Sequence, residues 1–255
     1  MGIVLNEREW AENAIAERNL GKRPSETLNR VAKYYFQCEK YKKPEVREKL
    51  EDFLLKCDPN IILVKWADAI DRAVRAADKY PLIHIDSVGI TRGEMETIHS
   101  LPGKQSRKLA FTMLCVAKYW DAVQPKNNGW VNTQDREVMA MANISTSIKR
   151  QNELLHEMRN MGLIGFSKRV DSLNIQVLFM DDTEVCVGIS DFRNLGNQYS
   201  LQCGEPFFQC AQCGLTIRKK NNAHKYCPQC AAEMYIRKSV ASVARQRTAA
   251  DRSAG

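Results

Sequence analysis

Cys210-Ala211-Gln212-Cys213 is a Cys-x2-Cys pair. A second pair, Cys227-Pro228-Gln229-Cys230, follows after thirteen residues, and together they are the most specific pattern in the C-terminal quarter of the chain. Each Cys-x2-Cys pair can present two thiolates to one metal ion, and the residues between them suffice for a small hairpin. The spacing therefore predicts a zinc ribbon. Four sulfur ligands leave no position for water, so we expect one structural Zn²⁺ ion. The alternatives are two chance pairs of reduced thiols, or disulfides in an oxidising compartment.

The bulk composition is that of a globular protein, with 44% apolar and 27% charged residues. A chain of 255 residues can bury one large core or two small ones beside the ribbon. Since no run approaches ~18 apolar residues and the first seven residues lack a secretory pattern, we expect neither a membrane span nor export. Nine cysteines without a signal then favour thiol-bound metal in a reducing cytoplasm.

The formal net charge of +8 is distributed unevenly along the chain. Residues 1–104 hold 18 Lys and Arg against 17 Asp and Glu, whereas residues 206–255 hold nine against two. A basic end of this kind suits a phosphate backbone or an acidic protein surface, although a charged run can also be a solvated face.

Residues 1–88 are expected to form a helical module. Val46, Leu50, Phe53 and Leu54 recur at helical spacing after Pro44, and residues 63–77 repeat apolar side chains at three- and four-residue steps. Shorter helices are predicted at residues 10–20 and 27–36, followed by an extended run at 82–86 that links to the next module. Their aromatic side chains could stack on bases, but in helices such residues usually fill the core.

Residues 89–200 are expected to form a winged helix-turn-helix domain. A Thr91–Glu94 capping box opens a first helix, and core spacing predicts another around residues 105–120. Thr133 is expected to cap a helix of about ten residues, and Ser145 to cap a longer one that ends before Gly162. Residues 163–166 and 173–180 then read as two strands around a turn. This order of helices and strands resembles the winged-helix superfamily, in which the second helix of the helix-turn-helix commonly enters the major groove.

The resemblance implies a recognition helix over residues 146–161, with basic residues in the wing and in the ribbon. Lys and Arg would hold phosphates or guanine edges, and Asn could pair with adenine. Two observations oppose a broad DNA footprint, namely Glu153 and Glu157 on the helix and the acidic stretch at residues 170–205. The predicted nucleic-acid-binding residues are Thr146, Ser147, Lys149, Arg150, Asn152, Arg159, Lys168, Arg169, Arg218, Lys219, Lys220 and Lys225.

A second resemblance covers roughly residues 85–235. It rests on three motifs: Lys108-Leu109-Ala110-Phe111 through Ala117-Lys118-Tyr119-Trp120, then Gly129-Trp130-Val131-Asn132, then Ile189-Ser190-Asp191-Phe192-Arg193-Asn194. Together they resemble an uncharacterised family encoded by phages and integrated elements of Firmicutes, which pairs a winged-helix-like core with a C-terminal zinc ribbon. The resemblance implies a mobile-element protein that acts in a bacterial cytoplasm on nucleic acid or on host machinery, and it identifies no catalytic or binding residues.

The remaining expectations concern the C-terminal end and the function. The ribbon is placed at residues 201–238, with Cys203 as a buried thiol, and residues 239–255 are expected to form a basic flexible tail. Since no phosphate-cradling loop or nucleophile elbow is present, we expect no enzyme. The leading hypothesis is a protein that binds double-stranded DNA in replication initiation or transcription control. In the alternative, the chain is a non-enzymatic adaptor or inhibitor that binds a host protein or nucleoprotein complex. The N-terminal helices could hold a host or phage protein partner.

Overall fold

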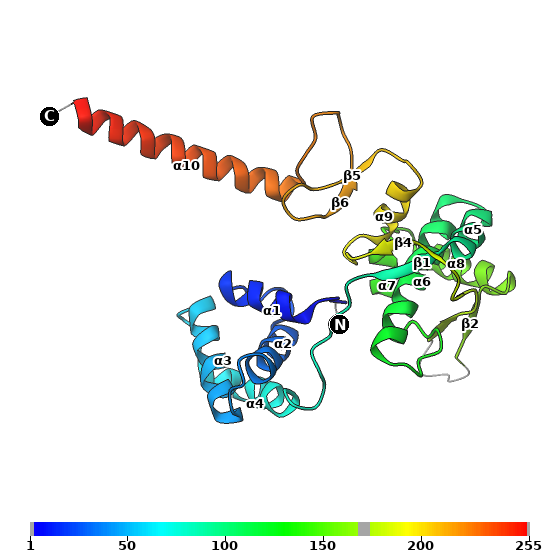
Figure 1. Cartoon of the computed structure of the whole chain (residues 1–255), viewed down its shortest axis with the longest axis horizontal. Coiled ribbons are helices and arrows are strands. Elements are labelled where there is room, and N and C mark those ends of the chain that lie inside the picture. The colour runs from blue at the N-terminus through cyan, green and yellow to red at the C-terminus, as the bar shows by residue number, and fades with distance from the viewer. Residues whose placement is uncertain (1–2, 168–173, 254–255) are drawn as a thin grey trace. The chain divides into compact units, whose positions relative to one another are not determined.

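A computed structural model describes residues 3–167 and 174–240, and the backbone alone of residues 241–253. It is mainly helical, and the described residues form three two-stranded sheets (Figure 1), which confirms the predicted fold class of mainly α with small β. The chain divides into two compact units. The first comprises Met1–Val88, Ala122–Pro125 and Gly188–Phe192, and the second comprises Gly89–Asp121, Lys126–Val187 and Arg193–Gly255.

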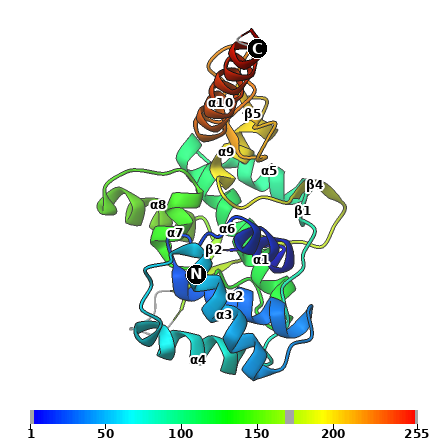
Figure 2. The same ribbon diagram turned by 90° about the vertical axis from the view of Figure 1, so that its left-hand side faces the viewer.

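The first unit is built mainly from helices. Pro24 at the start of α2 and Pro44 in the first turn of α3 occupy positions where the missing N–H costs no helical hydrogen bond. Helix α2 packs against α1, α3 and α4 (Figure 2), around a core that includes Leu28, Leu50 and Phe53. The elements are α1 (Glu7–Ala16), α2 (Pro24–Gln37), α3 (Lys43–Cys57), the 3-10 helix η1 (Leu63–Trp66) and α4 (Ala67–Ala76).

A buried carboxylate joins three parts of this unit. Glu7 is 2% exposed and accepts hydrogen bonds from the Arg30 guanidinium at 3.3 Å and from the Lys33 ammonium at 3.0 Å. Its carboxylate also accepts the backbone N–H of Ile83 at 3.1 Å. The extended run at residues 82–86 is therefore not only a link. It pairs with the segment before α1 through an antiparallel bridge between Asn6 and His84.

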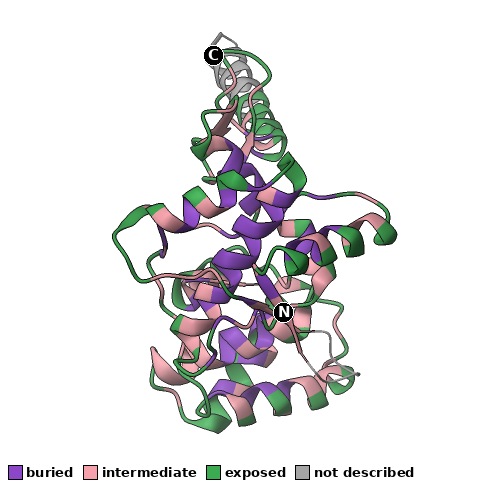
Figure 3. Cartoon of the chain, turned by 90° about the vertical axis from the view of Figure 1, so that its right-hand side faces the viewer, coloured by how far each residue is buried: buried purple, intermediate pink, exposed green. Residues whose placement is uncertain are grey.

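The second unit is organised around α6, a long helix that is buried along most of its length. Leu109, Phe111, Met113 and Leu114 are fully buried, and buried residues line the interiors of both units (Figure 3). The elements are β1 (Val88–Thr91), α5 (Arg92–Ser100), α6 (Lys104–Val123), α7 (Asp135–Met141), α8 (Ile148–Asn160), β2 (Ile164–Phe166), β3 (Ile175–Val177), β4 (Val185–Ile189), α9 (Leu195–Gln202), β5 (Phe207–Gln209), β6 (Thr216–Arg218) and α10 (Pro228–Ser253). Strand β1 pairs with β4.

The predicted capping box at the start of α5 is present, and it belongs to a larger buried network. The Thr91 hydroxyl accepts the N–H of Glu94, whose carboxylate accepts the N–H of Thr91 in return. The same carboxylate is 2.8 Å from the ammonium of Lys118 on α6 and accepts the N–H of Asp181 at 3.0 Å. One fully buried side chain thus ties together β1, α6 and the segment that precedes β4.

Strands β2 and β3 form an antiparallel hairpin in which Ile164 faces Val177 and Phe166 faces Ile175. An isolated bridge between Trp130 and Gln176 adds an extended segment to β3, and Val131 donates to the carbonyl of Ile175 at 2.8 Å. The approach requires glycine at position 129, whose φ is +78°, because a Cβ there would lie 2.7 Å from the Val177 carbonyl oxygen.

Two local expectations about helix starts were wrong. Helix α7 has seven residues and begins after Gln134, because the Thr133 hydroxyl accepts the indole N–H of Trp120 instead of capping the helix. Helix α8 is capped by Ser147, whose hydroxyl accepts the N–H of Arg150, and not by Ser145. The residues expected to form a basic flexible tail, 239–255, include the end of α10, whose helical backbone continues to Ser253.

Candidate metal centre and nucleic-acid interface

Four cysteine sulfur atoms gather at one point of the second unit. The Sγ atoms of Cys210, Cys213, Cys227 and Cys230 all lie within 4.8 Å of one another, and those of Cys213 and Cys227 are 3.8 Å apart. Tetrahedral zinc with bonds of about 2.3 Å places its sulfur ligands about 3.8 Å apart. All nine cysteines are free thiols, and these four sulfur atoms form one group instead of two bonded pairs. The predicted four-cysteine cluster is confirmed, and zinc stays a prediction.

The backbone around the sulfur atoms is shaped to bring them together. The first Cys-x2-Cys pair lies in the connection between β5 and β6, where Gly214 adopts a φ of +73° and its N–H donates to the Cys210 carbonyl. The second pair lies at the start of α10, so that Cys230 falls in the first helical turn behind Pro228. The N–H of Cys227 donates to the Cys210 sulfur at 3.2 Å, which links the two pairs.

The electrostatics of the cluster suit a cation. Burial disfavours ionisation of Cys210, but backbone N–H groups of Cys227, Cys213 and Gln212 outweigh it and lower the pKa of Cys210 to about 6. The hydrogen bond with Cys227, together with burial, raises the pKa of Cys230. Neighbouring thiols that cannot all ionise together without a counter-charge are the donor set that a divalent thiophilic metal stabilises. The residues present therefore fit a Zn²⁺ ion.

The ribbon, defined as β5, β6 and the four-cysteine cluster, is attached to α9. Helix α9 packs against both strands, and the Asn197 amide donates to the Thr216 carbonyl at 3.1 Å. The Asn143 amide, in the turn after α7, donates to Asn197 at 3.0 Å. A Cβ at Gly196 would lie 1.9 Å from the Ala142 carbonyl oxygen, so glycine permits this close approach.

The predicted recognition helix is shorter than expected, and its predicted residues differ in their surroundings. Leu154, Leu155 and Met158 form its buried face. Lys149, Asn152 and Arg159 are exposed, and the Arg159 guanidinium lies 5.3 Å from the centre of the Phe166 ring. Thr146 and Ser147 precede the helix, Ser147 being its N-cap.

Arg150 has partners within its own helix. Its guanidinium donates to the Glu153 carboxylate at 3.1 Å and to the Glu157 carboxylate at 2.8 Å. These two carboxylates were expected to weaken the positive field of the helix, and they do so by pairing with this arginine. Among the predicted contacts of α8, Lys149, Asn152 and Arg159 are therefore better placed to reach a nucleic acid.

The predicted wing residues Lys168 and Arg169 lie outside the described residues. In the ribbon, Arg218 is the last residue of β6, and Lys220 and Lys225 are exposed in the loop that follows. Lys219 is half-buried, and its N–H donates to the Pro206 carbonyl. The structure thus places these basic residues on the ribbon, and the predicted contacts of α8 on a separate element.

Cys203 was expected to be a buried thiol, and it is exposed. It lies at the C-terminal end of α9, where its Sγ atom is 3.7 Å from Nε2 of His99 on α5. It is not part of the four-cysteine cluster. The buried residues of α9 are 195–200, and Cys203 follows them as the C-cap of the helix.

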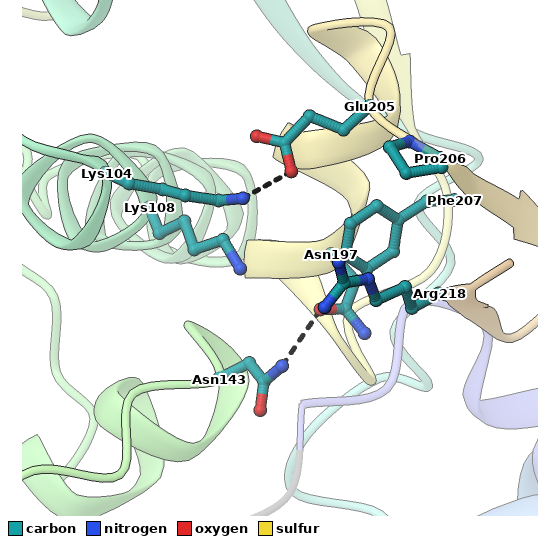
Figure 4. A pocket seen from close by; sticks show the side chains of 8 residues that line it. All are labelled: Lys104, Lys108, Asn143, Asn197, Glu205, Pro206, Phe207 and Arg218. Carbon is teal, nitrogen blue, oxygen red and sulfur yellow. Dashed lines mark hydrogen bonds and ion pairs between the residues drawn. The ribbon is translucent and has the colours of Figure 1, made fainter. Parts of the chain in front are cut away.

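A polar pocket in the second unit was not predicted (Figure 4). Its lining comes from α6, the turn after α7, α9 and the ribbon: Lys104, Lys108, Asn143, Asn197, Glu205, Pro206, Phe207 and Arg218. The one sequence signal was a pair of lysines four residues apart on a predicted helix. The other lining residues are distant in sequence, so only the fold brings them together.

Comparisons with protein-family models, with curated proteins and with solved structures found no match to this chain. Among the helices of the described residues, none has the length and apolar character needed to cross a bilayer.

Proposed function

We propose that this chain is a DNA-binding protein that combines a winged helix with a zinc ribbon. The observation that carries the proposal is the order of elements from α6 to β3: a helix, an extended segment at Trp130, helices α7 and α8, and the β2–β3 hairpin. Trp130 forms an isolated bridge to Gln176 of β3, so the extended segment lies beside the two-stranded β2–β3 sheet. This arrangement is the one expected of a winged helix.

In this proposal α8 is the recognition helix. Its buried face anchors it, while Lys149, Asn152 and Arg159 occupy the exposed face at helical spacing. Lys and Arg at these positions bind phosphates or guanine edges, and Asn can pair with adenine. Lys168 and Arg169 would follow the flanking backbone from the wing.

The ribbon supplies a second contact with the phosphate backbone. One Zn²⁺ ion held by the four cysteines would fix both ends of the segment between Cys213 and Cys227, which carries Arg218, Lys219, Lys220 and Lys225. The metal has a structural role, since four thiolates leave no coordination position for water or substrate. The protein is then a binding protein without catalytic activity.

The biological setting rests on the resemblance to the phage and prophage family alone. On that basis the chain serves replication initiation or transcription control of a mobile element, in the cytoplasm of a bacterial host. The first unit would hold a protein partner in that process.

Fluorescence anisotropy of the zinc-loaded protein with labelled duplex and single-stranded DNA, repeated over a salt series, tests the proposal. We expect duplex binding that weakens steeply with salt, since each phosphate contact adds about one to the log–log slope. A Lys149→Gln, Asn152→Ala, Arg159→Gln variant should lose affinity. A Lys65→Gln variant, which removes an exposed lysine of the first unit, is the control. Equal affinity of all three proteins would contradict the assignment of α8.

A second candidate function is a protein-binding adaptor or inhibitor that acts on a host complex. The observation that favours it is the exposure of apolar side chains in the first unit, where Ile62 is 56% and Val64 84% exposed. Flat anisotropy at low salt, together with a host protein whose capture is lost in an Ile62→Asp, Val64→Asp variant, would support this function over DNA binding.

A further inference from the structure

The pocket of the second unit is closed on several sides by side chains from four parts of the fold. It has a volume of about 270 Å³, with Lys104 and Lys108 on α6, Asn197 on α9, and Phe207 and Arg218 on β5 and β6 (Figure 4). This volume is near the lower end for pockets that enclose small molecules, which begins at about 300 Å³. A pocket of this size can hold one phosphate with part of its nucleoside, whereas a DNA duplex is too wide to enter it.

The charges in the pocket are unequal. The Lys104 ammonium pairs with the Glu205 carboxylate, so these two largely neutralise one another. Lys108 and Arg218 make no ion pair with any carboxylate of the described residues. The pocket therefore keeps two cations in excess over its single carboxylate.

Lys108 is the unusual member of the set. It is 8% exposed, and its ammonium lies 5.8 Å from the centre of the Phe207 ring and points into the pocket (Figure 4). Burial lowers the pKa of Lys108, and the neighbouring Lys104 ammonium lowers it further. The Glu205 carboxylate offsets this shift only in part and is already paired with Lys104, so an anion in the pocket would stabilise the charged form of Lys108.

The other walls suit a group that is both charged and planar. Asn143 and Asn197 are held in fixed orientation, because Asn143 donates to Asn197 and Asn197 donates to the Thr216 carbonyl. The Phe207 ring gives the pocket an aromatic wall beside Lys108. An aromatic side chain can stack on a base or cover a sugar, while the two cations bind a phosphate.

We propose that this pocket binds the terminal phosphate of a nucleotide, either at the end of a nucleic-acid strand or in a free nucleotide. A phosphate monoester carries a charge of about −1.5 to −2 at neutral pH, which matches the two cations. A phosphate inside a strand carries a single charge, so it matches the two excess cations less well. Binding to a strand end deepens the proposed function and rests on it, whereas binding of a free nucleotide does not.

The test uses the full-length, zinc-loaded protein and two kinds of probe. Fluorescence anisotropy compares oligonucleotides that carry a 5′-phosphate, a 3′-phosphate or hydroxyl groups at both ends. Isothermal titration calorimetry measures adenosine 5′-monophosphate and inorganic phosphate. We expect about tenfold tighter binding of a phosphorylated end than of a hydroxyl end, the effect of one charge-assisted contact. If the pocket instead takes free nucleotides, adenosine monophosphate should bind with no preference among the oligonucleotide ends.

Variants assign the binding to the pocket. Lys108→Met removes the charge and leaves an unbranched side chain that is one atom shorter, so the protein should fold at least as well and lose the phosphate effect. Arg218→Gln removes the second excess cation of the pocket and should also reduce phosphate binding. Lys65→Gln, outside the pocket, is the control. A preference that persists unchanged in both pocket variants would overturn the proposal.

The outcomes for the pocket and for DNA binding can be separated. Salt-sensitive duplex binding with no preference for phosphorylated ends and no heat with adenosine monophosphate would overturn the pocket and leave the proposed function standing. Lys108-dependent binding of adenosine monophosphate by a protein that binds no DNA would support the pocket and overturn the proposed function.

Discussion

Two buried carboxylates, one in each unit, hold together segments that are distant in sequence. Glu7 pairs with Arg30 and Lys33, and Glu94 pairs with Lys118 while it caps its own helix. Pairs of this kind give little net stability compared with apolar residues of the same volume, but the loss of one partner leaves the other charge uncompensated. The direction of these effects can be tested at Glu94, which is fully buried.

Replacing Glu94 with Gln should destabilise the second unit strongly. The Lys118 ammonium would lose its carboxylate, and removal of one partner from a buried pair costs about 3–5 kcal/mol. Urea denaturation followed by circular dichroism measures this change. The Glu94→Gln, Lys118→Met double variant should be less destabilised than Glu94→Gln alone. Equal stability of the two variants would show that the ion pair is not what holds these segments.

Gly196→Ala should destabilise the contact between α9 and the end of α7. The added methyl group would overlap the Ala142 carbonyl oxygen, and backbone atoms cannot move aside cheaply, so we expect a loss of about 1–3 kcal/mol. Gly165→Ala is the matched control, because its nearest atoms would lie 3.9 Å from the new Cβ. Thermal unfolding of both variants distinguishes a steric effect from a general effect of replacing glycine.

Arg150 and Lys149 are neighbours on α8, but their replacement should have different effects on DNA binding. Arg150 already donates to two carboxylates, whereas Lys149 is exposed. Lys149→Gln should lower duplex affinity and reduce the salt slope by about one, as expected for one lost phosphate contact. Arg150→Gln should change both quantities less. A larger effect at Arg150 would mean that its ion pairs open when DNA binds.

Among the elements, those specified by residues close in sequence were predicted correctly. Features that depend on tertiary contacts were not predicted. The Cys-x2-Cys spacing, the Thr91–Glu94 box and the alternation of Ile175 and Val177 each depend on residues close in sequence, and each is found. The start of α8 was missed by two residues, and the start of α7 was missed because a competing partner lies further away in the sequence. Thr133, for example, accepts from Trp120 and does not cap α7. The pocket was missed for the same reason.

The ribbon should bind about one equivalent of zinc per chain, since its four sulfur atoms complete a tetrahedral site. Cys227→Ser should lose most of this zinc, because Cys227 is one of the four sulfur ligands and contacts both sulfur atoms of the first pair. Cys203→Ser should retain it, because Cys203 lies outside the cluster. Metal analysis of the purified proteins by mass spectrometry gives the stoichiometry. Equal zinc content in all three proteins would contradict the assigned ligands.

At the scale of the whole molecule, the two units differ in what stabilises them. The first has a continuous apolar core of its own, formed by α1 to α4. In the second unit, the packing around α6 is supplemented by the ribbon, whose apolar contacts are few and centre on the cysteines. A small element with so little apolar burial depends on its metal for folding.

Metal removal should therefore affect the two units unequally. Differential scanning calorimetry of the metal-loaded protein should resolve two transitions, since each unit can unfold as a cooperative body. A chelator should lower the temperature of one transition and leave the other in place, because the core of the first unit contains none of the metal-binding cysteines. The Cys227→Ser protein should already show the lowered transition and respond little to chelator. A single transition that shifts as a whole would mean that the two units unfold together and that the metal stabilises both.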